Sequence, residues 1–142
     1  MPELINIYEE QGKFRHASRY ARKLMLRKYF NNFYDIIYKK LLEFNNKITK
    51  FGKVKNTLVY LNYLKENEKY LKNPFFDGKG TFRQEITASN QIQEEVVNLL
   101  SNNFDNKVPS NIINLTQQRN YLGALEEFRK FEKQEKQQTN HR

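Results

Sequence analysis

The chain has 142 residues, about the length of one domain, and it contains no cysteine. This excludes a disulfide framework and a thiolate metal site, and no apolar run is long enough to cross a bilayer. Hydrophobic residues make up 38% of the chain, and aromatic residues make up 14%, so we expect a modest core rich in Phe and Tyr. The first twelve residues carry three glutamates and no apolar secretory segment, which predicts an intracellular protein of the cytoplasm or mitochondrial matrix, not a secreted one.

The net charge is +9, and all of it lies in the first half. Residues 1–72 hold 16 Lys and Arg against 7 Asp and Glu, whereas residues 73–142 hold 9 of each. Such a polarised chain is typical of a protein with one face for an anionic partner. Heavy use of Lys, Asn, Ile, Phe and Tyr is also typical of AT-rich coding, which explains part of the lysine content but not the arginines or the asymmetry.

The hydrophobic spacing predicts helices from the first residues onward. A short helix is expected over about 2–10, and Gln11-Gly12 ends it. Apolar residues then recur at steps of 3 and 4 over 13–51, which predicts either one long basic helix or two helices with a joint near Asn31-Asn32. Gly52 is a suitable C-terminal stop for this segment.

The second half of the chain continues the helical pattern. A helix over about 54–71 is expected to pack antiparallel on the long helix, followed by a loop over 73–86. A fourth helix would begin near Ser89 or Asn90, and a fifth would span from about Ser110 or Thr116 to Lys133. These elements predict an all-α fold of four to five helices in a single domain over 1–133, with a disordered polar tail over 134–142.

The strongest functional pattern is an acid-free basic stretch in the first half of the long helix. Arg15, Arg19 and Arg22 follow at i, i+4 and i+7 on one predicted face, where like charges repel by about 0.2–0.5 kcal/mol per pair. An anionic partner would relieve this repulsion, and phosphate suits arginine because the two bind bidentately. The predicted nucleic-acid-binding residues of this stretch are Lys13, Arg15, Arg19, Arg22, Lys23, Arg27 and Lys28.

Two other interpretations of this stretch stay open. A purely solubilising surface helix could carry the same charges. Residues 13–30 are also Arg-rich, acid-poor and amphipathic, as internal mitochondrial import signals are.

A second basic cluster surrounds Gly52. Lysines beside a predicted helix C-terminus complement the helix dipole, so part of this pattern has a structural explanation. Exposed lysines on a turn also suit backbone contacts to RNA without base specificity. The predicted phosphate-binding residues here are Lys47, Lys50, Lys53 and Lys55.

Two short segments resemble parts of known families. The run Tyr8 to Phe14, followed by Ala17 and Ala21, is similar to the first half of a tetratricopeptide-type helix pair, and residues 120–128 show a fainter likeness. No 34-residue period joins the two, so a repeat array is not predicted.

A second likeness involves scattered positions around the lysine cluster. Phe44, Asn46-Lys47, Lys50 and Gly52-Lys53, followed by Asn73-Pro74 and Val108-Pro109, loosely resemble the ribosomal protein family that organises the head of the small subunit. The glycine-rich hairpin and the C-terminal half of that family are missing. The resemblance implies a ribosomal setting.

No pattern predicts catalysis, a cofactor or a metal site. His16 and His141 are the two histidines, and neither lies near a set of metal-ligating residues. The segment Gly78 to Thr81 lacks the spacing of a phosphate-binding loop. We therefore expect a non-enzyme, namely a basic subunit of a ribonucleoprotein. The expected particle is of the ribosome type, with a mitochondrial ribosome as one candidate. The expected partners are rRNA-like RNA and neighbouring protein subunits. The alternative is a structural accessory subunit of a large assembly such as a respiratory-chain or cytoskeletal complex.

Overall fold

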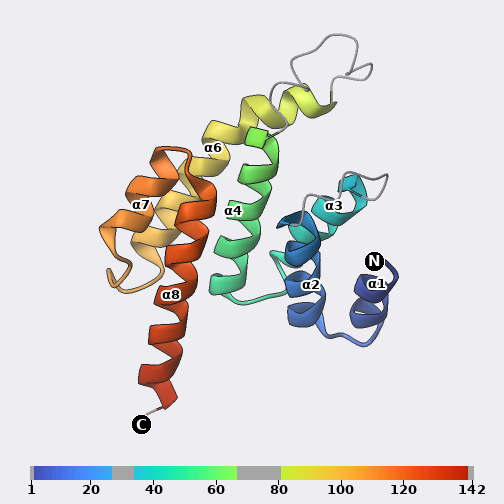
Figure 1. The fold of residues 1–142 in the computed structure, drawn as a ribbon, viewed down its shortest axis with the longest axis horizontal. Helices are drawn as coiled ribbons and strands as arrows, with labels where there is room; N and C mark the ends of the chain where they lie inside the picture. The colour runs from blue at the N-terminus through green and yellow to red at the C-terminus, as the bar shows by residue number, and fades with distance from the viewer. Residues whose placement is uncertain (1, 27–33, 67–80, 141–142) are drawn as a thin grey trace. The chain divides into compact units, whose positions relative to one another are not determined.

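A computed structural model describes residues 2–26, 34–66 and 81–140, and every regular element in these ranges is an α-helix (Figure 1). The predicted all-α class is confirmed, but the predicted count of four to five helices is wrong. The chain forms two compact units, Met1–Tyr60 and Leu61–Arg142, and the division falls inside one helix. The helices of the described residues are α1 (Pro2–Glu10), α2 (Phe14–Leu26), α3 (Tyr34–Phe44), α4 (Lys50–Glu66), α6 (Thr81–Asn102), α7 (Ser110–Gln117) and α8 (Tyr121–Asn140).

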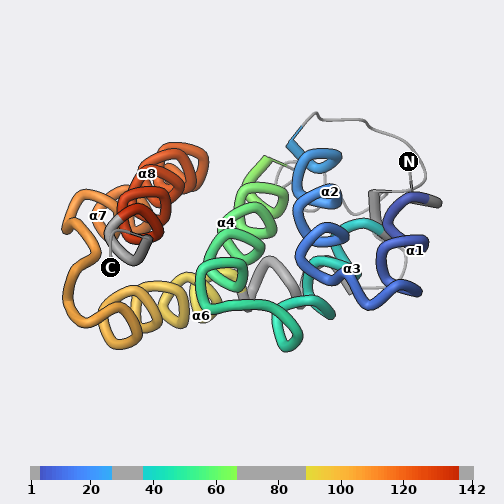
Figure 2. The backbone as a smooth tube through the Cα atoms, turned by 90° about the horizontal axis from the view of Figure 1, so that it is seen from below, coloured from blue at the N-terminus to red at the C-terminus, as the bar shows by residue number. Residues whose placement is uncertain are grey.

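In the first unit, α2 packs on both α1 and α3, and the three helices lie side by side (Figures 1 and 2). Small side chains on α2 allow this close approach, because Ala17 and Ala21 are fully buried. The predicted apolar stripe largely lines the core. Its buried members, with residues of α1 and α4, are Ile5, Leu24, Ile37, Leu41, Phe44, Val54 and Leu58.

The predicted long helix is shorter than expected. Helix α2 ends at Leu26, and α3 begins at Tyr34, so the alternative joint near Asn31-Asn32 lies outside the described residues. Helix α3 ends at Phe44, and residues 45–49 form a turn, which makes the prediction of a continuous helix to residue 51 wrong.

The start of α4 explains this error. The Gly52 N–H donates a hydrogen bond to Oγ1 of Thr49 at 3.2 Å, and the Lys53 N–H donates to the Thr49 carbonyl at 2.9 Å. Thr49 is therefore the N-cap of α4, and Gly52 lies in its first turn instead of ending a helix.

Side-chain contacts link α3 and the turn after it to α4, and the predicted antiparallel packing of the long helix on its partner stays a prediction. Asn45 Nδ2 donates to Thr57 Oγ1 at 3.4 Å. The rings of Tyr38 on α3 and Tyr60 on α4 also stack, with their centroids 5.7 Å apart.

In the second unit, α7 packs on α6 and on α8. A cluster of three rings fills its interior, with centroids 5.7–5.9 Å apart in edge-on and tilted arrangements. Its members are Phe104, Phe128 and Phe131. Helix α6 begins at Thr81, earlier than the predicted start near Ser89 or Asn90, and the single helix predicted between Ser110 and Lys133 is in fact α7 and α8.

The ends of the chain and of the predicted loop are only partly described. Of the predicted loop over 73–86, residues 73–80 lie outside the described residues. Helix α8 runs to Asn140, into the segment for which composition predicts a disordered tail.

The α1–α2 and α7–α8 turns have the same local geometry. In the first, the N–H groups of Gly12 and Lys13 donate to the carbonyls of Glu9 and Tyr8 at 3.0 and 2.8 Å. In the second, the N–H groups of Arg119 and Asn120 donate in the same pattern to the carbonyls of Thr116 and Leu115 at 3.1 and 2.9 Å. Both are Schellman motifs, whose central residue takes a left-handed conformation.

The central residues of the two turns differ chemically. Gly12 has a φ of +71°, which glycine adopts without strain, whereas Arg119 has a φ of +64°. A Cβ at Gly12 would meet no heavy atom within 4 Å, so only backbone strain opposes a larger residue there.

We expect reciprocal substitutions in these turns to have opposite effects on stability. Gly12→Ala should lower the free energy of unfolding by about 1 kcal/mol, because an L residue in the left-handed region costs about 1–2 kcal/mol. Arg119→Gly should raise it by up to about 1 kcal/mol. Urea denaturation with unchanged m-values would measure both changes. Changes of the same sign in the two variants would contradict the turn assignment.

Candidate nucleic-acid interface

Helix α2 has a basic exposed face and an apolar buried face. Arg15, Arg19 and Lys23 follow at i, i+4 and i+8, and all three are exposed on the side opposite Ala17 and Ala21. At 1.5 Å per residue, they rise in steps of about 6 Å along the helix. Within the described residues these three side chains form no ion pair with a carboxylate. The face is therefore a row of three cations.

Arg22 does not belong to this row. The prediction that it shares an exposed face with Arg15 and Arg19 is wrong, because its residue is only 5% exposed. Its Nη1 donates to Ser18 Oγ at 2.7 Å and to Oδ1 of Asn56. At 100° per residue, Arg22 lies at the edge of the buried arc of α2, and its side chain turns inward to this polar network.

Asn56 is the centre of the network and ties three helices together. Its Oδ1 also accepts a hydrogen bond from Ser18 Oγ at 2.8 Å, and its Nδ2 donates to the Leu41 carbonyl at 3.2 Å. Asn56 and Ser18 are each 1% exposed. Arg22 thus has a structural role between α2 and α4.

The second predicted cluster lies at the start of α4, not at the end of a helix. Lys47, in the preceding turn, is exposed, as are Lys50 and Lys53 in the first turn, whereas Lys55 is half-buried. The N-terminal end of a helix carries partial positive charge, so lysines there are unfavourable with the dipole. The favourable interaction with a helix C-terminus that the sequence suggested therefore does not explain these lysines.

Phe14 brings the two basic segments together. The Lys47 ammonium lies 4.8 Å from the centroid of the Phe14 ring, which also packs on Phe44 with centroids 6.1 Å apart. Phe14 is the first residue of α2, directly between Lys13 and Arg15 in the chain, and Lys13 is exposed. The cation–π contact therefore places the lysine turn beside the basic start of α2. We call the exposed residues of this region the basic face: Lys13, Arg15, Arg19, Lys23, Lys47, Lys50 and Lys53.

Two predicted residues cannot be placed on the basic face. Arg27 and Lys28 lie outside the described residues. The other nine predicted residues lie in the first unit, and seven of them belong to the basic face.

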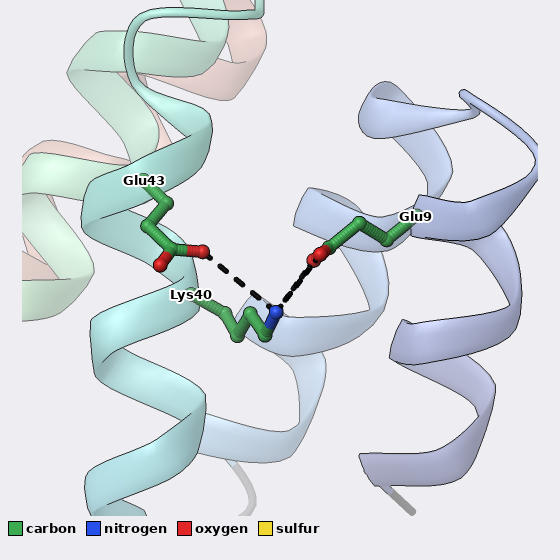
Figure 3. A network of polar contacts seen from close by, with 3 residues as sticks. All are labelled: Glu9, Lys40 and Glu43. Atoms are coloured by element: carbon green, nitrogen blue, oxygen red, sulfur yellow. Dashed lines mark hydrogen bonds and ion pairs between the residues drawn. The ribbon is translucent and has the colours of Figure 1, made fainter.

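A carboxylate neutralises one further lysine of the unit. Lys40 Nζ on α3 donates to both carboxylate oxygens of Glu9 on α1 at 2.7 and 3.0 Å, and Glu43 Oε2 lies 3.7 Å away (Figure 3). The hydrogen bond to Glu9 raises the pKa of Lys40, burial acts in the opposite direction, and the charges of both glutamates add to the rise. Lys40 therefore serves to fasten α1 to α3, in contrast to the cations of the basic face.

The division into units sharpens the charge asymmetry. Met1–Tyr60 holds 13 Lys and Arg against 5 Asp and Glu, a net charge of +8, whereas Leu61–Arg142 holds 12 against 11, a net charge of +1. Residues 44–65, which include the lysine turn, contain no acidic residue. The positive charge is thus a property of one compact unit.

The described residues offer no other chemistry of note. Among them, no group of three or more His, Asp or Glu side chains could hold a metal ion. No described helix is long and apolar enough to cross a membrane. A search of protein-family models, of curated proteins and of solved structures found no match to this chain. The basic face is therefore the candidate site.

Proposed function

We propose that this chain is a non-enzymatic RNA-binding subunit of a ribonucleoprotein, which docks on RNA phosphates through the basic face of its first unit. The juxtaposition at Phe14 carries the proposal, because it brings the lysine turn beside the start of α2, so that two acid-free basic segments from different parts of the chain lie in one region of the first unit. Phosphate is the partner that relieves both the repulsion along α2 and the unfavourable dipole at the start of α4. Arginine and lysine contacts to phosphate also release counterions.

The proposed setting is a ribosome-type particle. A mitochondrial particle is one candidate, because residues 13–30 resemble an internal mitochondrial import signal. The second unit, with its net charge of +1, would contact neighbouring protein subunits. These finer assignments rest on sequence patterns. Copurification with and without nuclease would identify the particle.

A salt titration of RNA binding tests the proposal. The logarithm of the association constant should fall linearly with the logarithm of salt concentration, with a slope of about −3.5 to −5 if five to seven cations contact single-stranded RNA phosphates. Filter binding or fluorescence anisotropy on the full chain would measure it. An affinity unchanged between low and moderate salt would overturn the phosphate model.

The rival function is a structural subunit whose basic face meets acidic protein. Its motivation is the same charge, because carboxylates also pair with Arg and Lys. Nuclease separates the two: a ribonucleoprotein subunit loses its partners on nuclease treatment, and a subunit held by protein contacts keeps them.

A further inference from the structure

An aromatic pair lies at the basic face, between α1 and α2. The rings of Tyr8 and His16 have centroids 5.6 Å apart and are tilted by 43°. His16 is exposed, and Tyr8 is half-buried. The imidazole is therefore accessible to solvent while it contacts the phenol ring.

The helix register places this pair among the cations. His16, Arg19 and Lys23 follow at i, i+3 and i+7, which puts them on one side of α2. The α1–α2 turn fixes the backbone of the partner residue, because the Lys13 N–H donates to the carbonyl of Tyr8 at 2.8 Å. His16 and the two cations thus lie on the same side of α2, and the Tyr8 ring contacts His16.

We propose that Tyr8 and His16 form a stacking position for an unpaired RNA base, next to the cations that hold the backbone. This proposal rests on the proposed function and names the form of its ligand as single-stranded RNA. Aromatic rings interleaved with basic residues stack on splayed-out bases, and every base offers a ring face, so no sequence preference is required. In a duplex the bases are already stacked and paired, and only the phosphates are accessible to this face.

The test compares two RNAs and matched variants of the full chain. The probes are a mixed-sequence single strand of about 12 nucleotides and the duplex that it forms with its complement. Tyr8→Leu and His16→Gln each remove one ring, and Tyr8→Phe keeps the ring but loses the hydroxyl. Tyr8→Leu and His16→Gln should each raise the Kd for the single strand about fivefold or more and leave the duplex Kd within about twofold. Tyr8→Phe should match the parent chain on both probes.

Circular dichroism and unfolding midpoints would check that the variants fold. His16→Gln alters an exposed side chain that is not part of the core. Equal shifts on the two probes, or no shift on either, would overturn the stacking position while the salt slope of the parent chain still supports phosphate docking. Salt-independent binding, or none, of both RNAs by the parent chain would overturn the proposed function and the stacking position together.

Discussion

Replacing Arg15, Arg19 and Lys23 by Gln in one variant should weaken RNA binding about 100-fold near 0.1 M salt. These three side chains form the exposed row of α2, and each phosphate contact contributes about 0.7 to 0.9 to the slope of log K against log salt. The slope of the variant should therefore be shallower by about 2 to 3. Stability should change little, because exposed side chains without ion pairs contribute little to folding.

A matched variant separates contact from total charge. Arg129, Lys130 and Lys133 are exposed on α8 in the second unit, and changing them to Gln alters the net charge by the same amount. This control should retain most of the affinity and the parent slope. An equal loss in both variants would mean that general attraction, not the basic face, governs binding.

Much of the local structure could be predicted from the sequence. The turn after α1 follows from Gly12, since glycine is the residue that takes the left-handed conformation readily. The stripe of Ala17, Ala21 and Leu24 identified the buried side of α2, because steps of 3 and 4 return to one face. The same periodicity implies that the opposite side, with Arg15 and Arg19, faces solvent.

The wrongly predicted helix boundaries lie at two turns where the stop or cap does not come from a glycine. The turn between α7 and α8 has Arg119 in the position that glycine usually occupies, so the sequence carries no stop there. At the α3–α4 turn, Gly52 resembles a helix end, but the effective signal is the hydroxyl of Thr49, which caps the next helix. Caps depend on hydrogen bonds to neighbouring backbone groups, and these bonds are not visible in hydrophobic spacing.

The candidate site was predicted in composition but not in arrangement. The contact of Lys47 with Phe14 joins residues 33 positions apart, which no local pattern indicates. Arg22 shows the reverse problem, since a charged residue in a basic run is expected at the surface. Its burial depends on Asn56, which lies 34 positions further along the chain and supplies the hydrogen-bond acceptor.

Asn56→Ala should therefore lower the free energy of unfolding by about 3–5 kcal/mol, because it removes the acceptor shared by Arg22 and Ser18 inside the first unit. The donor to the Leu41 carbonyl is lost as well. Since domains are stable by only about 5–15 kcal/mol, the change should be large in urea denaturation. Asn45→Ala is the matched control. That amide is half-buried and makes a 3.4 Å bond to Thr57, so its loss should cost less than about 1 kcal/mol.

Replacing the whole network by apolar residues should recover most of the loss. Asn56→Leu combined with Arg22→Met and Ser18→Ala leaves none of the three polar side chains behind, and such replacements are often neutral or stabilising. The same triple variant should bind RNA with the parent salt slope, because Arg22 is buried and contributes no phosphate contact. A slope reduced by about 1 in the folded variant would return Arg22 to the basic face, and an Asn56→Ala cost no larger than that of Asn45→Ala would contradict the network.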